Sequence, residues 1–449
     1  MPEESLRNVK ELKQKTGRVA YVNARLLNPA SGLDAPGGLL TDGKLIADFG
    51  PGLFDAGVPE GAEVVDCAGH CLAPGLVDMH VHLREPGHEH KETIATGSLS
   101  AAAGGVTSMA CMPNTEPVID GVALIEFIQR RARETSLVKV YPFGAVTRGL
   151  KGEQLTEIGL MAEAGAVGFS DDGVAVFDSM VMRRALAYGR LFGILISQHA
   201  EDPALSGTGC MAEGAHATRL GLPGIPEASE VVVVERDIRL VELTGGRYHV
   251  AHISTKGAID AVRRAKERGL PVTCEATPHH FTLTDESVAD YRTFAKMAPP
   301  LRSEENRLAV LEGLKDGTID AIATDHAPHD QESKRVPFAH AANGVVGLET
   351  LLPLALELYH LGHMTLLGLL KTVTVTPADL LGIPAGRLQR GRAADLVLFD
   401  PALGWTLETQ ALRSKSKNSP FADRRMKGRA LRTIVNGQVV YELGRPRAR

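Results

Sequence analysis

The middle of the chain alternates short apolar, β-branched runs with helical stretches, and this alternation constrains the fold more than any other feature. Eight runs have the composition of strands: residues 76–83, 105–113, 138–146, 166–172, 192–200, 248–255, 271–280 and 320–329. Helical segments such as residues 124–134 and 257–269 separate them. Strands that alternate with helices are typical of βα units and a parallel sheet. Eight such units over about 310 residues predict an α/β fold of the (β/α)₈ TIM-barrel class.

The two ends of the chain have a different texture. Residues 18–73 and 386–449 contain short strands separated by turns, and Asn436-Gly437 is a strong hairpin signal between two apolar runs. We therefore expect a small β-sandwich domain built from both of these segments. We expect a metal-dependent catalytic barrel over residues 74–385 and a polar N-terminal extension over residues 1–17.

Composition excludes several classes of protein. The chain has 49 basic and 54 acidic residues, a net charge of −5, so nothing suggests a nucleic-acid partner or a membrane surface. No apolar run approaches the roughly 18 residues of a membrane span, and the charged N-terminus is unlike a signal peptide. Five cysteines form no paired framework. We expect a reduced, cytoplasmic protein.

Histidines gather at the expected strand ends. His80 and His82 close the first strand, and residues two apart on a strand face the same side. Such a pair could instead be one turn residue and one core residue, but about half of the sixteen histidines lie at these ends, where barrel enzymes place their functional groups. The other strand ends carry Arg84, Asn114, Asp171, Asp172, His199, His252, His279, His280, Asp325, His326 and His329. Imidazoles with carboxylates suit zinc or another divalent first-row ion.

This residue set indicates metal-assisted hydrolysis. Two ions close together need a bridging anion, for which Asp172 is the candidate, with a hydroxide as the second bridge. Asp325 can bind one ion and also exchange a proton with the bridging hydroxide and a leaving nitrogen. No Ser-His-Asp order, phosphate-binding glycine loop or dinucleotide fingerprint competes with this interpretation.

A family resemblance follows from eight motifs. They are GLVDMHVHLREPG, ATGSLSAAAGGVTSMACMPNTEP, GFSDDG, ISQHAED, VAHIST, CEATPHH, IATDHAPH and GVVGLET. With these motifs the chain resembles the amidohydrolase superfamily over nearly its whole length and, within it, the bacterial class I dihydroorotases. The resemblance implies a zinc-dependent hydrolase of cyclic amides that interconverts N-carbamoyl-L-aspartate and L-dihydroorotate in pyrimidine (UMP) biosynthesis.

The resemblance also implies roles for individual residues. One zinc would be held by His80, His82, Asp172 and Asp325, and the other by Asp172, His199 and His252. The substrate would be bound by His82, Arg84, Asn114 and His329, with the Asn343-Gly344 backbone facing the pyrimidine ring. The substrate is a small molecule. The number of bound metals, a homodimer and an association with aspartate transcarbamoylase are left open.

Two positions depart from the family pattern. Many superfamily members bridge their metals with a carboxylated lysine, but AVGFSDDG contains no lysine, and the choice of Asp172 over Asp171 rests on alignment. Ala298 stands where the family often has an asparagine, so one substrate hydrogen bond is missing. This second departure bears on substrate affinity more than on the class of reaction.

Alternative interpretations remain at this point. His279 and His280 fit structural roles better than metal ligation, because the ligand set is already filled.

A related cyclic amidohydrolase is the main rival function. HLREPG followed by MPNTEP favours an acidic substrate and argues against a hydantoinase, whereas an allantoinase shares parts of these motifs. A third possible function is that of a non-catalytic scaffold subunit with the same fold.

Overall fold

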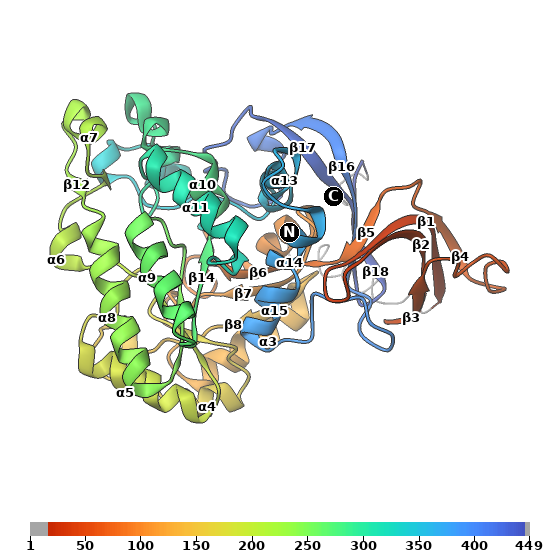
Figure 1. The fold of residues 1–449 in the computed structure, drawn as a ribbon, viewed down its shortest axis with the longest axis horizontal. Coiled ribbons are helices and arrows are strands. Elements are labelled where there is room, and N and C mark those ends of the chain that lie inside the picture. The colour runs from red at the N-terminus through yellow and green to blue at the C-terminus, as the bar shows by residue number, and fades with distance from the viewer. Residues whose placement is uncertain (1–16, 445–449) are drawn as a thin grey trace.

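The computed structural model describes residues 17–444, and within them eight short strands form a parallel barrel (Figure 1). They are β6 (Leu76–Val81), β7 (Val106–Cys111), β8 (Lys139–Pro142), β9 (Phe169–Ser170), β10 (Leu195–Gln198), β13 (Arg247–Val250), β14 (Val272–Ala276) and β15 (Ala321–Ile322). Strands β6, β7 and β8 pair in one group, and β9, β10, β13, β14 and β15 pair in the other. Parallel bridges from Gly144 to Phe169 and from Val81 to His326 join the two groups into a closed barrel. The predicted (β/α)₈ fold is confirmed.

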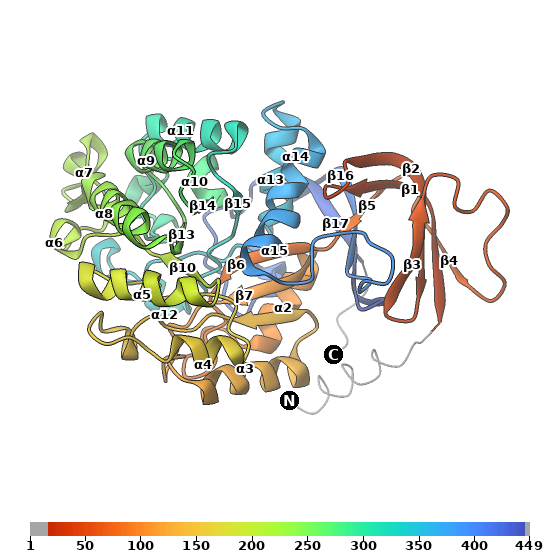
Figure 2. The same cartoon turned by 60° about the horizontal axis from the view of Figure 1, so that its bottom comes forward.

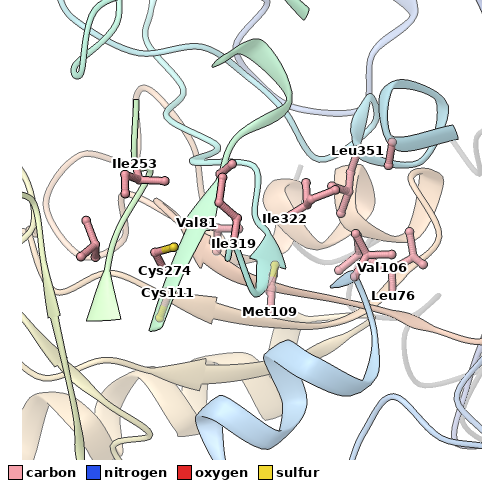
Figure 3. Packing of buried hydrophobic residues seen from close by; sticks show 14 of the residues in the cluster. Leu76, Val81, Val106, Met109, Cys111, Ile253, Cys274, Ile319, Ile322 and Leu351 are labelled. Atoms are coloured by element: carbon pink, nitrogen blue, oxygen red, sulfur yellow. The ribbon is translucent and has the colours of Figure 1, made fainter. Parts of the chain in front are cut away.

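The barrel strands are largely apolar because helices cover them. Every residue of β6 and β7 is buried, as expected for parallel strands packed on both faces. Figure 3 shows side chains such as Val81, Met109 and Cys111 packed together in this core. Helix α9 (Lys256–Glu267) illustrates the cover: Thr255 caps its first turn by accepting from the Ala258 amide, and its apolar face is buried against the barrel.

The helices follow the strands as βα units require. They are α2 (Ile94–Ala103), α3 (Val122–Thr135), α4 (Ile158–Glu163), α5 (Ser179–Leu191), α6 (Pro203–Ser206), α7 (Ala215–Leu220), α8 (Ala228–Thr244), α9, α10 (Pro278–Thr282), α11 (Glu304–Asp316), α12 (Gln331–Lys334), α13 (Leu351–His360), α14 (Leu366–Thr372) and α15 (Val375–Leu381). Short 3₁₀ turns are η1 (Arg148–Leu150), η2 (Asp285–Tyr291), η3 (Thr293–Ala295), η4 (Phe338–His340) and η5 (Thr409–Ala411). No helix in the described part of the chain has both the length and the apolar character needed to cross a membrane.

Two local features differ from the sequence-based expectation. The seventh strand, expected over residues 271–280, ends at Ala276, and Pro278 then opens the short helix α10 that carries His279 and His280. Proline favours the first helical position, where its missing N–H is not needed. In addition, the connection from β10 to α8 contains a small parallel pair, β11 (Met211–Ala212) and β12 (Gly224–Ile225), which the sequence pattern does not reveal.

A second sheet combines strands from both ends of the chain. It comprises β1 (Arg18–Asn28), β2 (Leu33–Asp42), β3 (Leu45–Gly50), β4 (Glu63–Asp66), β5 (Cys71–Pro74), β16 (Leu396–Thr406), β17 (Arg425–Val435) and β18 (Gln438–Glu442). Strand β5 pairs antiparallel with β16, which joins the N-terminal and C-terminal parts. These strands enclose a separate core that includes Leu26, Leu72 and Leu396. Figure 2 shows this small β domain beside the barrel.

The sheet therefore builds the expected β domain from both ends. Asn436 and Gly437 form the expected hairpin turn between β17 and β18, with φ values of 50° and 73°. The domain boundaries at residues 73/74 and 385/386 stay a prediction. Of the expected N-terminal extension, residues 1–16 lie outside the described residues.

Candidate active site

The candidate ligands converge at the carboxyl ends of the barrel strands. His80 lies on β6 and the others follow the strand ends: His82 after β6, Asp172 after β9, His199 after β10, His252 after β13 and Asp325 after β15. Each of the six residues is at most 6% exposed. A closed parallel barrel brings all these strand ends to one rim, so residues far apart in sequence share one buried volume.

Asp172 lies at the centre of this cluster. Its Oδ1 is 3.3 Å from His80 Nε2 and its Oδ2 is 3.3 Å from His82 Nε2. Its Oδ1 is also 3.6 Å from His252 Nε2 and 3.9 Å from His199 Nδ1. Two groups of possible metal ligands result, His80–His82–Asp172 and Asp172–His199–His252, and Asp172 belongs to both. Asp325 Oδ1 lies 3.1 Å from His82 Nε2, at the edge of the first group.

The donor atoms fit a divalent metal site. His80 Nε2 and Asp172 Oδ1 are buried and have no hydrogen-bond partner among residues 17–444, whereas His252 Nε2 lies 2.9 Å from His199 Nδ1. Buried polar atoms without partners are costly, so such a cluster needs an ion to complete it. Four imidazoles and two carboxylates are the ligand types that zinc and similar ions prefer.

Local electrostatics holds Asp172 and His199 in forms that can bind a metal ion, whereas at His80 burial is outweighed by the charges of Asp172 and Glu275, which raise its pKa. Burial opposes ionisation of Asp172, but the imidazoles of His80 and His252 outweigh it and hold the pKa of this carboxyl well below its usual range. Burial, together with the neighbouring His252, lowers the pKa of His199 to about 4. An anionic carboxylate and a neutral imidazole are the forms that bind a metal ion.

Asp171 is turned away from the cluster. Its Oδ1 accepts a hydrogen bond of 2.9 Å from the Thr147 amide, and its Oδ2 accepts one from the Thr147 hydroxyl. Burial raises the pKa of Asp171 to about 6, although the bonds from Thr147 oppose this shift. Adjacent residues at a strand end point to opposite sides, so only Asp172 enters the site.

Three of the ten non-glycine residues with positive φ among residues 17–444 lie at this rim. Arg84, His252 and Asp325 have φ values of 62°, 33° and 47°, in the left-handed region that residues with a Cβ rarely adopt. Such strain costs of order 1–3 kcal/mol per residue and persists where the surrounding structure enforces it. Here it occurs at two candidate metal ligands and at the candidate anion-binding arginine.

The predicted substrate-binding residues lie beside the cluster. Arg84 Nε donates to the Pro328 carbonyl at 3.2 Å, and its Nη2 lies 3.3 Å from His329 Nε2. Asn114 Oδ1 lies 2.8 Å from His82 Nδ1. Gly344, with φ of 129°, packs so closely on Ala327 that an added Cβ would lie 2.6 Å from the Ala327 side chain. Only glycine fits at that position.

Arg84 is a cation that has no carboxylate in ion-pair contact among residues 17–444. It is partly buried. Burial lowers its pKa to about 10, which still leaves the guanidinium charged at neutral pH. A charged fork without a carboxylate in ion-pair contact, beside the candidate metal cluster, is suited to bind an anionic group.

The remaining histidines at the rim have other surroundings. His280 uses both ring nitrogens, with Thr277 Oγ1 at 2.7 Å and the Pro299 carbonyl at 3.1 Å. His279 belongs to neither ligand group and is 2% exposed. His326 Nδ1 accepts from the Gly347 amide at 3.1 Å, and its Nε2 is 3.5 Å from Glu92. These positions agree with structural roles.

Sequence reasoning missed Glu275. Its Oε1 is 2.7 Å from His80 Nδ1 and its Oε2 is 3.4 Å from His249 Nε2, with only 1% of the residue exposed. The charge of His80 overcomes the effect of burial and lowers the pKa of Glu275 to about 2. A carboxylate on the outer nitrogen fixes the ring orientation of a metal-binding histidine. The available signal was an acidic residue inside the apolar strand β14.

We expect Glu275→Gln to weaken metal binding about 10- to 100-fold, because an amide can no longer stabilise the orientation and basicity of His80 as a carboxylate does. Metal titration of the purified variant measures this. Asp237→Asn is a matched control, since Asp237 is equally buried but its carboxylate bonds to Tyr248 and Gln198 and to none of the candidate ligands. Equal metal affinity in both variants would contradict the role of Glu275.

Comparison with known proteins identifies the family of this chain. The family described as dihydro-orotase-like matches residues 69–258. A dihydroorotase of Wolbachia sp. subsp. Brugia malayi (strain TRS) is 53% identical over 430 residues, covering 95% of this chain and 97% of that protein. A dihydroorotase of Geobacter sp. (strain M21) is 52% identical and covers 94% of this chain and 98% of its own.

A solved structure extends the comparison to the fold. The L-hydantoinase (dihydropyrimidinase) from Arthrobacter aurescens superposes with a TM-score of 0.85 at 26% sequence identity, covering 95% of this chain and 96% of its own. The fold is thus shared with hydantoinases, whereas sequence identity above one half over nearly the whole length is shared with dihydroorotases. The chain therefore belongs to the dihydroorotase family.

Proposed function

We propose that this chain is a dihydroorotase that interconverts N-carbamoyl-L-aspartate and L-dihydroorotate in UMP biosynthesis, with two zinc ions per subunit. The observation that carries the proposal is the unpaired guanidinium of Arg84 beside the buried His/Asp cluster. This arrangement places a group that can bind an acidic substrate beside a centre that can hydrolyse it. The near full-length similarity to curated dihydroorotases supports the same activity.

The proposed ligand assignment divides the cluster in two. His80, His82, Asp172 and Asp325 hold one ion, and Asp172, His199 and His252 hold the other. When bound, zinc supplies a water that is acidic near neutral pH and polarises the substrate carbonyl. Glu275 keeps His80 oriented from the outer side.

Asp325 is the proposed proton carrier. In hydrolysis it accepts the proton of the water that attacks the ring amide carbon, and it returns this proton to the ring nitrogen as the C–N bond breaks. Cyclisation runs through the same steps in reverse, with water as the product. Burial opposes ionisation of Asp325, but the hydrogen bond with His82 and the nearby imidazoles keep its pKa well below the usual range, so it starts as an anionic base.

The substrate carboxylate is assigned to the Arg84 side of the site. Arg84 offers a charged fork in contact with His329, and Asn114 contacts the candidate ligand His82. Burial and the Arg84 charge lower the pKa of His329 to about 2, so its ring is neutral and can donate one hydrogen bond without adding charge. The Asn343-Gly344 backbone is assigned to the ring of the substrate.

A panel of substrates tests the proposal. Purified protein should hydrolyse dihydroorotate and cyclise carbamoyl aspartate, with little turnover of hydantoin or allantoin, and metal analysis should give two zinc ions per chain. Preferential turnover of hydantoin or allantoin would identify a related cyclic amidohydrolase. A protein that binds metal but turns over none of these substrates would be the scaffold form.

Arg84→Met should raise KM for dihydroorotate roughly 10- to 100-fold, because a charge-assisted pair with the carboxylate is worth about 1.5–3 kcal/mol. An uncharged cyclic imide never uses this pair and should show a much smaller change. Steady-state kinetics with both substrates measures the difference. Equal losses for the two would mean that Arg84 supports the metal site or its loop.

The proposed reaction also predicts the cellular location of the enzyme and the assemblies that it could form. We predict a cytoplasmic enzyme that acts on a small molecule, and a homodimer and an association with aspartate transcarbamoylase are the two assemblies to examine. Size-exclusion chromatography with light scattering, with and without purified aspartate transcarbamoylase, distinguishes monomer, dimer and mixed complex.

A further inference from the structure

A six-residue segment between β16 and β17, residues 413–418, lies against two loops of the barrel rim; we call it the clasp. Its first set of contacts is with the loop after β6 that contains Arg84. The Ser414 hydroxyl and the Lys415 amide donate to the Glu92 carboxylate. The Ser416 hydroxyl donates to the Lys91 carbonyl at 2.7 Å. The clasp thus binds the backbone and a buried acid of the loop that carries the candidate anion-binding residue.

The second set of contacts comes mainly from Asn418 and is with the loop after β15. Its Nδ2 donates to the carbonyls of Ala327 and Gly344, both at 3.0 Å. Its Oδ1 accepts from the His329 amide at 3.1 Å. Its own carbonyl accepts from the Val346 amide at 3.0 Å. Asn418 is 2% exposed, so water does not replace these bonds.

The amide of Asn418 matches this environment in a way few side chains can. It supplies two N–H donors and one acceptor, and all three are used. The groups it holds are the backbone of His329 and of Gly344, which the proposed function places against the substrate. His329 in turn contacts Arg84 Nη2 at 3.3 Å. One buried side chain therefore links the positions of three proposed substrate-binding elements.

We infer that Asn418 is a positioning residue that sets affinity for the acidic substrate without touching it. This inference rests on the proposed function, because it assigns Asn418 to the substrate-binding loops of that reaction. It also gives the C-terminal segment of the small β domain a part in the site of the barrel. If Asn418 is truncated, two carbonyls and one amide lose their buried partners and the loop after β15 loses its fixed position.

The test compares Asn418→Ala with Asn28→Ala. Asn28 is also 2% exposed, and its side chain bonds two backbone groups of Leu388 in the small β domain. We expect Asn418→Ala to raise KM for dihydroorotate about tenfold or more, with kcat changed only a few-fold and metal content unchanged. Asn28→Ala should lower the melting temperature without changing KM. An unchanged KM in Asn418→Ala, or an equal rise in both variants, would overturn the inference.

A second readout does not depend on the substrate. Hydrogen–deuterium exchange of the free protein should show faster exchange at the amides of His329 and Val346 in Asn418→Ala than in wild type or Asn28→Ala. If the protection of these two amides is unchanged, Asn418 does not order the loop after β15, and the inference is wrong even if KM rises. If wild type fails to turn over dihydroorotate, the proposed function fails, and the exchange experiment still decides whether Asn418 orders the loop.

Discussion

Asp172→Ala is expected to lose about one equivalent of divalent metal per chain and nearly all activity. Asp172 is the one carboxylate shared by both candidate ligand groups. Without it, two divalent cations held by the two ligand groups would repel each other with no protein charge between them. This repulsion is strong because charges in a low-dielectric site interact strongly. Metal analysis of the purified variant and an assay with dihydroorotate measure the two losses.

Asp171→Ala is the matched control for this experiment. Asp171 is the adjacent carboxylate, but it bonds to Thr147 on the other side of the chain. Its removal should lower stability by roughly 1–3 kcal/mol, because the buried Thr147 amide loses its acceptor, while metal content stays at the wild-type level. If Asp171→Ala loses the metal and Asp172→Ala keeps it, the bridging role belongs to Asp171.

Asp325→Asn is expected to keep the fold and at least one metal while turnover falls roughly 10²- to 10⁴-fold. The amide is nearly isosteric with the carboxylate, but it cannot accept the proton of the attacking water. Asp330→Asn is a suitable control, because Asp330 caps α12 by accepting from the Ser333 amide at 2.8 Å and takes no part in the cluster. Turnover near the wild-type level with full metal content would remove Asp325 from the proton-transfer role.

The sequence was informative where a local pattern has one physical cause. Parallel strands covered on both faces must be apolar throughout, so all eight barrel strands were found, including the two-residue strands β9 and β15. Functional side chains at the ends of those strands followed from the same argument, because a barrel brings strand ends together. The spacing of His80 and His82 predicted that they share one face, and the other histidines at the strand ends were needed to favour a metal site.

The missed features all depend on contacts between distant segments. Glu275 bonds to His80 across 195 residues, and Asn418 bonds to Ala327 across 91. Glu275 carried only the weak signal of an acidic residue inside an apolar strand, and Asn418 carried none in its own segment. The strand expected over residues 271–280 was too long because an apolar run does not reveal where Pro278 starts a helix.

The sequence by itself determined the class of fold, the set of candidate metal ligands and the resemblance to dihydroorotases, because hydrophobic period and residue type at strand ends are local properties. Only the tertiary structure decided which of two adjacent aspartates enters the site, since Thr147 takes the carboxylate of Asp171. It also decided that Arg84 has no ion-pair partner in residues 17–444, and that Asn418 bonds to the backbone of the loop after β15. These are properties of packing in three dimensions, where the partner of a polar group is set by the fold and not by its sequence neighbours.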